Sequence, residues 1–323
     1  MEERADLIDR PENNGHAEVF SRLALGTVQL GMPYGVANRR GQPSPEDACE
    51  IIRTAFDFGV RIFDTAQSYG ESEAVLGRCF QSLGVSGQVK VISKLHPELN
   101  YHDPSCLRES VLTSLKRLGV DSLYGLMLHR ASWLAEWSTG LGASLAELKE
   151  QHLTAFLGVS VYTPKETRDA LAIDEIDLIQ APFNIFDRRL IFSGALEQAR
   201  QLKKQMFLRS VFLQGLILMP LEDLPEHLSF ARPAMLQLEA FCREYGLDRK
   251  GFALGYALHR SGEAILVIGA ESTDQIRENM ALVLGAGSGT LSTTGTMDEE
   301  ILDAWDSLEL NISQKPINPS LWG

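Results

Sequence analysis

Four side chains with acid–base chemistry lie at or just after the ends of three successive apolar runs. Asp64 ends the segment RIFD, Lys94 lies near the end of the next run, and His129 ends the third; Tyr69 follows Asp64 by five residues. A carboxylate and an ammonium on neighbouring strands can form a buried ion pair, and a nearby ammonium lowers the pKa of tyrosine from about 10. With a histidine to orient a carbonyl oxygen, this set could protonate an alkoxide as a hydride arrives.

Each of these residues also has an ordinary structural explanation. A lone aspartate at a strand end usually caps or forms a turn. A lone histidine is more often a hydrogen-bonded structural group, and a lone lysine is usually solvated. Charged groups inside an apolar barrel need partners, so the combination, rather than any single residue, favours a catalytic site.

The elements that would position these residues are eight short apolar runs separated by helical patterns. Most runs are continuously apolar, which is typical of a parallel sheet covered on both faces. Eight strand–helix repeats predict a (β/α)8 TIM barrel, whose active site lies at the C-terminal ends of its strands. The alternative, an open doubly wound sheet, usually carries a GxGxxG turn, which this sequence lacks. The predicted strands are Leu23–Gln29, Arg61–Ala66, Lys90–Leu95, Leu123–His129, Ala155–Val161, Leu178–Phe183, Met206–Val211 and Ala264–Gly269.

Two of the intervening segments carry clear helix signals. Ser44 is a plausible N-cap before Pro45, which suits the first helical position. Ser105–Leu118 has apolar residues at helical spacing, and Gly119 follows it as a stop signal.

The segment Phe63–Gly77, FDTAQSYGESEAVLG, resembles the DTAxxYGxSExxLG signature of aldo-keto reductases. Further segments resemble that family in the same order, and together the matches cover roughly residues 22–285. They are Leu25–Gly31, Ile92–Lys94, Leu126–His129, Gly158–Ser160, Gln180–Asn184, Arg209–Ile217 and Ile268–Asn279.

The resemblance implies a catalytic tetrad of Asp64, Tyr69, Lys94 and His129, with Tyr69 as general acid. It also implies an extended NADPH that crosses the barrel mouth without a Rossmann fold, and the reduction of an aldehyde or ketone. The residues implied for the cofactor are Gly26, Thr27, Ser160, Gln180, Arg209, Ser210, Leu213, Gly215, Gly269, Ala270, Ser272, Gln275, Glu278 and Asn279.

Three departures from the family pattern affect the cofactor. Val161 replaces an asparagine, so a carboxamide contact is lost unless Gln180 compensates. Arg209 replaces the common tyrosine that stacks on nicotinamide; its planar guanidinium could stack too, or could reach an anionic substrate. The adenosine turn is acidic, with Arg277 as the nearest base. The resemblance implies NADPH, whereas an acidic turn suits the 2′-hydroxyl of NADH, so NADPH is the expected cofactor and NADH is the alternative.

Loop residues near the mouth are candidates for substrate contact, because specificity varies in loops. They suggest a polar or sugar-like carbonyl compound. These candidates are Gln29, Met32, Pro33, Tyr34, Gln67, Ser68, Arg130 and Trp133.

Two other functions remain alternatives. The first is a nucleotide-binding regulatory subunit of the same fold with little turnover. The second is a barrel lyase or aldolase in which Lys94 forms a Schiff base.

Composition narrows the partners and the compartment. The net charge of −13 and the absence of a basic stripe argue against nucleic acid. No run of 18 apolar residues predicts a membrane span, and the polar N-terminus favours a cytoplasmic protein. The four cysteines are far apart and form no CxxC, so we expect thiols rather than a disulfide or a zinc site, and no metal. Nothing predicts an obligate assembly, so we expect a monomer or weak homo-oligomer.

The predicted organisation is a flexible tail over residues 1–18 and a single barrel over 19–323. The barrel includes an extension over 285–323 that could fold back across the mouth. It consists of a Gly/Ser/Thr linker, Gly285–Thr296, an acidic helix near Asp298–Leu308, and an end at Ile317–Trp322. We expect Trp322 to be a packing anchor rather than a ligand contact.

Overall fold

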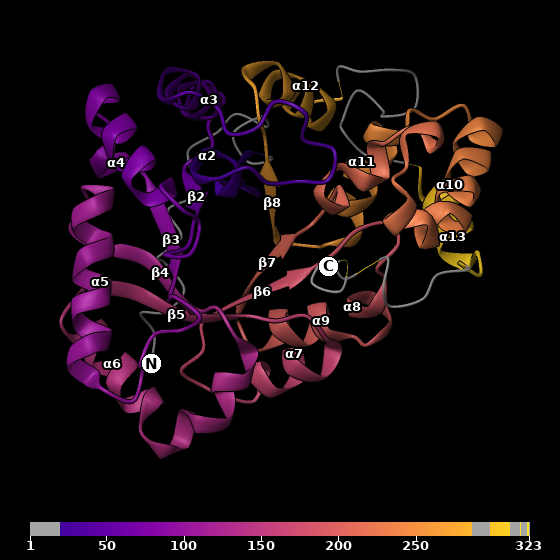
Figure 1. The fold of residues 1–323 in the computed structure, drawn as a ribbon. Coiled ribbons are helices and arrows are strands. Elements are labelled where there is room, and N and C mark those ends of the chain that lie inside the picture. Colours follow the sequence, from indigo (N-terminus) through magenta and orange to yellow (C-terminus); the bar gives the residue numbers. More distant parts are fainter. Residues whose placement is uncertain (1–19, 286–297, 311–316, 318–321, 323) are drawn as a thin grey trace.

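The structure is a computed structural model that describes residues 20–285, 298–310, 317 and 322. Eight parallel strands close into a barrel in sequence order, and β1 pairs with both β2 and β8 (Figure 1). This confirms the predicted (β/α)8 barrel. The strands are β1 Leu23–Gly26, β2 Ile62–Asp64, β3 Lys90–Lys94, β4 Leu123–Leu128, β5 Thr154–Ser160, β6 Leu178–Pro182, β7 Gln205–Arg209 and β8 Ile265–Gly269.

Helices surround the strands and bury the outer face of the barrel (Figure 1). Their bounds are α2 Val28–Gly31, α3 Pro45–Asp57, α4 Ser72–Leu83, α5 Pro104–Leu118, α6 Leu141–Glu150, α7 Pro164–Leu171, α8 Arg189–Phe192, α9 Ala195–Gln201, α10 Arg232–Tyr245, α11 Arg249–Arg260, α12 Thr273–Val283 and α13 Glu299–Ser307. None of the described helices is long and apolar enough to cross a membrane.

The predicted helix signals act as expected. The Ser44 side chain accepts a hydrogen bond from the backbone N–H of Asp47, so it caps α3. Helix α5 begins one residue earlier than predicted, at Pro104, because Asp103 is its N-cap. Gly119 ends α5 with a φ of 64°, in the left-handed region that favours glycine.

A second, smaller apolar cluster fills the inside of the barrel. Side chains alternate between the two faces of a strand, so residues two positions further along face the same way. The inner cluster therefore sets the direction of the polar residues that follow it toward the C-terminal ends. It consists of Ala24, Ile62, Ile92, Met127, Leu178, Phe207, Ile265 and Val267.

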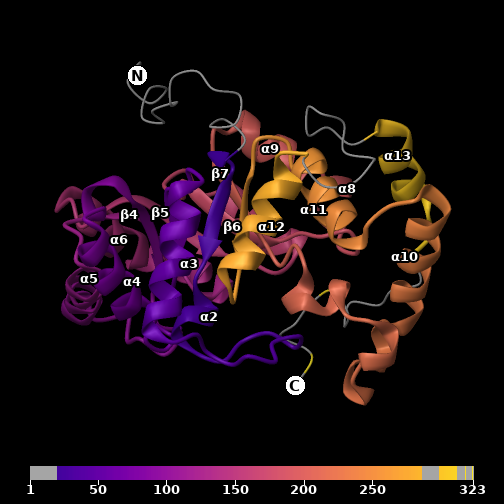
Figure 2. The ribbon, with the colours of Figure 1, turned by 90° about the horizontal axis from the view of Figure 1, so that it is seen from above.

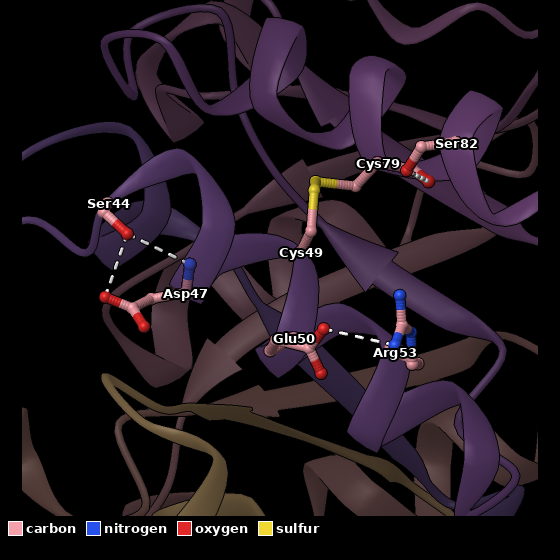
Figure 3. Close-up of a disulfide and its surroundings, with 7 residues drawn as sticks. All are labelled: Ser44, Asp47, Cys49, Glu50, Arg53, Cys79 and Ser82. Atoms are coloured by element: carbon pink, nitrogen blue, oxygen red, sulfur yellow. Dashed lines mark hydrogen bonds and ion pairs between the residues drawn. A yellow bond between two sulfur atoms is a disulfide. The ribbon is translucent and has the colours of Figure 1, made fainter.

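Two cysteines are paired, so the expectation of four thiols is wrong. Cys49 on α3 forms a disulfide with Cys79 on α4, across a separation of 30 residues (Figure 3). These neighbouring helices pack side by side, which brings together thiols that no short motif links. Cys106 and Cys242 are free.

The described part of the C-terminal extension, α13, lies beside α10, away from the strands (Figure 2). Arg188, in the segment after β6, donates to the carbonyl oxygens of Trp305, Asp306 and Leu308. Trp322 is buried in the main core cluster, as a packing anchor would be. The predicted N-terminal tail and most of the linker lie outside the described residues, as does most of the chain that would cross the mouth.

Candidate active site

One layer of residues at the C-terminal end of the barrel interior combines most of the predicted chemistry. Each member lies two positions after an inward-facing residue of its strand, so each shares the inward direction. An apolar layer supports this polar layer from below. The layer is staggered along the strands, since Asp64 pairs with Ile92 and Lys94 pairs with Met127. Its members are Gly26, Asp64, Lys94, His129, Ser160, Gln180, Arg209 and Gly269.

A cavity of about 640 Å³ opens above this layer. Of the predicted residues, those that line it are Gly26, Thr27, Gln29, Tyr34, Asp64, Tyr69, His129, Ser160, Arg209, Ser210, Gly215, Gly269, Ala270, Gln275, Glu278 and Asn279. Lys94 and Gln180 do not line the cavity but are fully buried next to Asp64.

Asp64 is the centre of a buried hydrogen-bond network. Lys94 Nζ donates to Asp64 Oδ1 over 2.7 Å and to the Thr65 carbonyl oxygen over 2.9 Å. Gln180 Nε2 donates to the same carboxylate oxygen over 2.7 Å. Burial lowers the pKa of Lys94, and the attraction of Asp64 opposes that change. The carboxylate thus fixes the lysine and stabilises its charge.

Two glycines hold the loop that carries Tyr69. Gly70 has a φ of 54°. A Cβ on Gly70 would lie 2.3 Å from the Gly31 carbonyl oxygen, and one on Gly31 would lie 1.9 Å from the Tyr69 carbonyl oxygen. Only glycine permits these approaches, and they fix the tyrosine loop against α2.

Tyr69 is half-buried beside Lys94 and His129. Lys94 Nζ lies 5.0 Å from the centre of the Tyr69 ring, and the Tyr69 and His129 ring centres are 5.9 Å apart. The pKa of Tyr69 is raised by burial and then by the negative charge of Asp64. Our expectation of a lowered pKa is therefore wrong, because the positive charge of Arg209, which opposes the rise, does not outweigh these two effects. Tyr69 keeps its proton at neutral pH.

His129 is a neutral imidazole in this environment. Burial lowers its pKa to about 3, helped by the positive charges of Lys94 and Arg209. Its Nδ1 lies 3.3 Å from Ser68 Oγ. A serine hydroxyl that donates to Nδ1 would leave the proton on Nε2, ready to donate to a carbonyl oxygen.

The opposite wall of the cavity is formed by Arg209, Tyr34 and Tyr162. Arg209 Nη2 donates to the Val161 carbonyl oxygen over 3.2 Å, and its guanidinium carbon lies 4.3 Å from the centre of the Tyr162 ring. Burial and the proximity of Tyr69 raise the pKa of Tyr34 to about 12. Sequence reasoning missed Tyr162, although it follows directly after the fifth predicted strand.

Several amide oxygens near the cavity are buried without a hydrogen-bond partner among the described residues. They belong to Gln29, Gln180 and Asn279. Gln180 uses its N–H on Asp64, so its oxygen is the atom that could receive a ligand. Gly269 leaves room for Gln29, since a Cβ there would lie 2.4 Å from Gln29 Nε2. Buried acceptors of this kind need donors, and they fit the N–H groups of a nicotinamide carboxamide and an adenine.

The loop after β7 has a strained backbone. Ser210, Leu213 and Gln214 have φ values of 66°, 47° and 56°, although none is a glycine. A Cβ on Gly215 would lie 2.5 Å from the Ala37 Cβ of the loop after α2. Strain of this kind is concentrated at ligand sites, and Ser210 and Gly215 line the cavity where the diphosphate is expected.

The adenosine end is formed by α12 and the residues before it. Ser272 is the N-cap of α12 and accepts from the Gln275 N–H, which limits its freedom to bind a ligand. Lys250 Nζ donates to Glu278 over 2.6 Å. Arg277 is exposed, pairs with Asp274 at 3.1 Å and does not line the cavity.

Six of the eight predicted substrate residues do not line the cavity: Met32, Pro33, Gln67, Ser68, Arg130 and Trp133. Gln67 turns toward α5, where it donates to Ser114 Oγ over 3.0 Å. Trp133 is buried against Tyr101, with ring centres 4.2 Å apart, and Arg130 is exposed. Gln29 and Tyr34 are the predicted substrate residues that do line it.

Comparisons with known proteins find a matching family and similar relatives. Residues 22–285 match the sequence model of the Aldo/keto reductase family. The chain is 26% identical to the NADH-specific methylglyoxal reductase of Escherichia coli (strain K12) over 297 residues, which are 81% of this chain and 89% of that relative. It is 25% identical to the pyridoxine 4-dehydrogenase of the same organism, over 81% of this chain and 88% of that relative.

Solved structures share the fold. The holo form of an aldo-keto reductase from Bacillus halodurans superposes with a TM-score of 0.70 at 19% identity, over 92% of this chain and 95% of that one. A glycerol dehydrogenase from Gluconobacter oxydans gives 0.66 at 22% identity, over 92% and 94%.

Proposed function

Because this chain belongs to the aldo/keto reductase family, we propose that it reduces an aldehyde or ketone to an alcohol, with Tyr69 as the proton donor. The family's members are oxidoreductases that use a nicotinamide cofactor, and a small-molecule substrate suits the cavity. The observation that carries the proposal is the position of Tyr69 and His129 on the cavity wall, beside the buried pair of Asp64 and Lys94.

The residues of the cavity fit a nicotinamide cofactor. Amide oxygens of Gln29 and Asn279, which line the cavity, would accept its N–H groups, and the strained loop from Ser210 to Gly215 would follow its diphosphate. When bound, the reduced cofactor supplies the hydride. The chain's own residues orient the carbonyl carbon toward it and exclude water from one side of the reaction.

Proton transfer depends on two neutral donors. At neutral pH Tyr69 holds its proton, and His129 is an uncharged donor that can orient the carbonyl oxygen. As negative charge develops on that oxygen, the Tyr69 O–H gives up its proton and the nearby Lys94 ammonium stabilises the phenolate. The lysine amine already donates to Asp64 and Thr65 in a buried site, so a Schiff base on Lys94 has no support.

For the cofactor we propose NADH in preference to NADPH, although the family resemblance favours NADPH. Arg277, the base nearest the adenosine turn, pairs with Asp274 outside the cavity, and Lys250 is paired with Glu278. A 2′-phosphate would have to compete with these carboxylates, whereas a 2′-hydroxyl would not. A similar relative is named as NADH-specific.

A cytoplasmic location stays a prediction. The disulfide between Cys49 and Cys79 weighs against it, because disulfides are rare where glutathione and thioredoxin keep thiols reduced. A monomeric or weakly associated state is likewise a prediction that size measurement in solution would decide.

The test is cofactor oxidation, followed as loss of nicotinamide absorbance with a panel of aldehydes and ketones. We expect consumption with at least one carbonyl compound, and a higher kcat/KM for NADH than for NADPH. Tight cofactor binding without consumption across the panel would contradict the proposal and favour the nucleotide-binding regulatory subunit. A large preference for NADPH would contradict the cofactor proposal alone.

A further inference from the structure

We propose that the carbonyl substrate carries a carboxylate and that Arg209 binds it. This inference rests on the proposed reductase function and names the class of its substrate. It also assigns Arg209, which stands where the family commonly has a tyrosine, a part in specificity.

The cations on the cavity wall differ in their partners. Three of them have a carboxylate within 4 Å: Arg39 has Asp223 at 2.7 Å, Lys250 has Glu278 at 2.6 Å, and Arg249 has Glu239 at 3.8 Å. Arg209 has none among the residues that the structure describes. An uncompensated charge in a partly buried site is unfavourable, so a bound anion would stabilise this wall.

Arg209 lies in the same inward layer as the catalytic residues. It ends β7, two positions after the inward-facing Phe207. Its positive charge lowers the pKa of His129 and opposes the rise in the pKa of Tyr69, so it acts within electrostatic range of both. A carboxylate on Arg209 and a carbonyl oxygen held by Tyr69 and His129 would therefore lie in the same cavity.

The guanidinium is held in a fixed plane with donors to spare. The Tyr162 ring supports one face at 4.3 Å, Nη2 donates to the Val161 carbonyl oxygen and Nη1 donates to Ser210 Oγ over 3.3 Å. The Tyr162 N–H donates to Glu166 Oε2 over 2.8 Å, and the same carboxylate forms the capping box of α7 with Thr163. Arginine has five N–H groups, and these two bonds leave enough for a bidentate carboxylate.

The chemistry favours a carboxylate over a phosphate. One guanidinium matches the single charge and the two oxygens of a carboxylate. A dianionic phosphate would need more positive charge, and the other cations on this wall are already paired. The competing explanation is that Arg209 only stacks on the nicotinamide ring, in which case it would serve every substrate equally.

The experiment compares two aldehydes of the same shape, 4-carboxybenzaldehyde and 4-carbamoylbenzaldehyde, which differ in charge. We expect the wild type to have a kcat/KM about tenfold or more higher for the carboxylate. Arg209→Gln should lower the carboxylate value by about 10- to 100-fold, mainly through KM, because charged hydrogen bonds of this kind are lost. The measure of the carboxylate contact is the ratio of kcat/KM for the carboxylate to kcat/KM for the amide, which should fall about tenfold or more, because a change in cofactor contact affects both aldehydes alike.

Two further variants control the result. Arg209→Lys keeps the charge but loses the planar fork, so it should give an intermediate kcat/KM for the carboxylate. Arg53→Gln removes an exposed arginine on α3 and should behave as the wild type. Benzoate binding, followed by calorimetry on the cofactor-bound protein, should weaken about tenfold or more in Arg209→Gln, independently of turnover.

The outcomes separate this inference from the proposed function. Equal losses with both aldehydes, or an unchanged benzoate Kd in Arg209→Gln, would overturn the carboxylate site and leave the reductase standing. If neither aldehyde nor any other carbonyl compound is reduced, the proposed function fails, and the benzoate measurement alone decides whether Arg209 binds a carboxylate.

Discussion

The two sides of the barrel mouth are built on different principles. On the side of β2 and β3, the buried charges of Asp64 and Lys94 neutralise each other, and a disulfide joins the two helices behind them. On the side of β7, Arg209 has no carboxylate partner among the described residues, and the loop that follows it holds Ser210 and Gln214 at positive φ.

The difference indicates which charged groups have partners within the protein and which need a ligand. The first side satisfies its own charges and hydrogen bonds, so its geometry does not depend on a ligand. The second side carries backbone strain and an uncompensated cation, both of which are unfavourable until something binds. We infer that the tetrad side sets the chemistry and that the β7 side receives cofactor and substrate.

The largest effect is expected from Lys94→Met, which tests whether the buried ion pair organises the side of β2 and β3. The variant would leave the Asp64 carboxylate buried without its cation, which we expect to lower the free energy of unfolding by about 3–5 kcal/mol. Urea unfolding measures this loss. The double variant Asp64→Asn/Lys94→Met removes both charges and should recover much of the stability. A single variant within about 1 kcal/mol of wild type would show that the pair does not organise this side.

Removal of the disulfide tests the same side of the barrel and should have a smaller effect on the free energy of unfolding. Cys49→Ala/Cys79→Ala should lower the free energy of unfolding by about 2–4 kcal/mol, since the link closes a loop of 30 residues in the unfolded chain. We expect kcat/KM to stay within about threefold, because Asp64 and Lys94 hold each other. The matched control is Cys106→Ala, which removes a free thiol. Equal unfolding curves for the two variants would contradict the link.

The smallest expected effect is the pH dependence of kcat/KM. The pKa of His129 is lowered to about 3, so its imidazole stays neutral throughout the range above pH 5. The pKa of Tyr69 is raised, so its proton is kept as pH increases. We expect kcat/KM for reduction of a neutral aldehyde to be nearly flat from pH 5 to 9. An acid limb near pH 6.5 that disappears in His129→Gln would show that the imidazole is not buried as described.

Much of the barrel follows from its sequence, since continuous apolar runs separated by helical patterns predict parallel strands. The meeting of Asp64 and Lys94 is also predictable, because both end strands at the same face of a barrel. The Cys49–Cys79 disulfide was not, as it depends on how α3 packs on α4.

The directions of loop side chains and the depth of their burial could not be predicted from the sequence either. Gln67 is near Tyr69 in the chain, but its side chain turns to α5, a choice that depends on the loop's conformation. The direction of the pKa shift of Tyr69 depends on how deeply the ring is buried and how near Asp64 lies. Tyr162 stood beside a predicted strand end, and only the folded wall shows that it supports Arg209.

The central claim, that Tyr69 donates the proton, is tested most directly by Tyr69→Phe. The measurement is single-turnover hydride transfer with cofactor binding measured separately, beside Tyr124→Phe, which alters a tyrosine packed on Phe156 outside the cavity. We predict a rate about 10²- to 10⁴-fold lower for Tyr69→Phe with cofactor Kd nearly unchanged, and a wild-type rate for Tyr124→Phe. A wild-type rate in Tyr69→Phe would contradict the account.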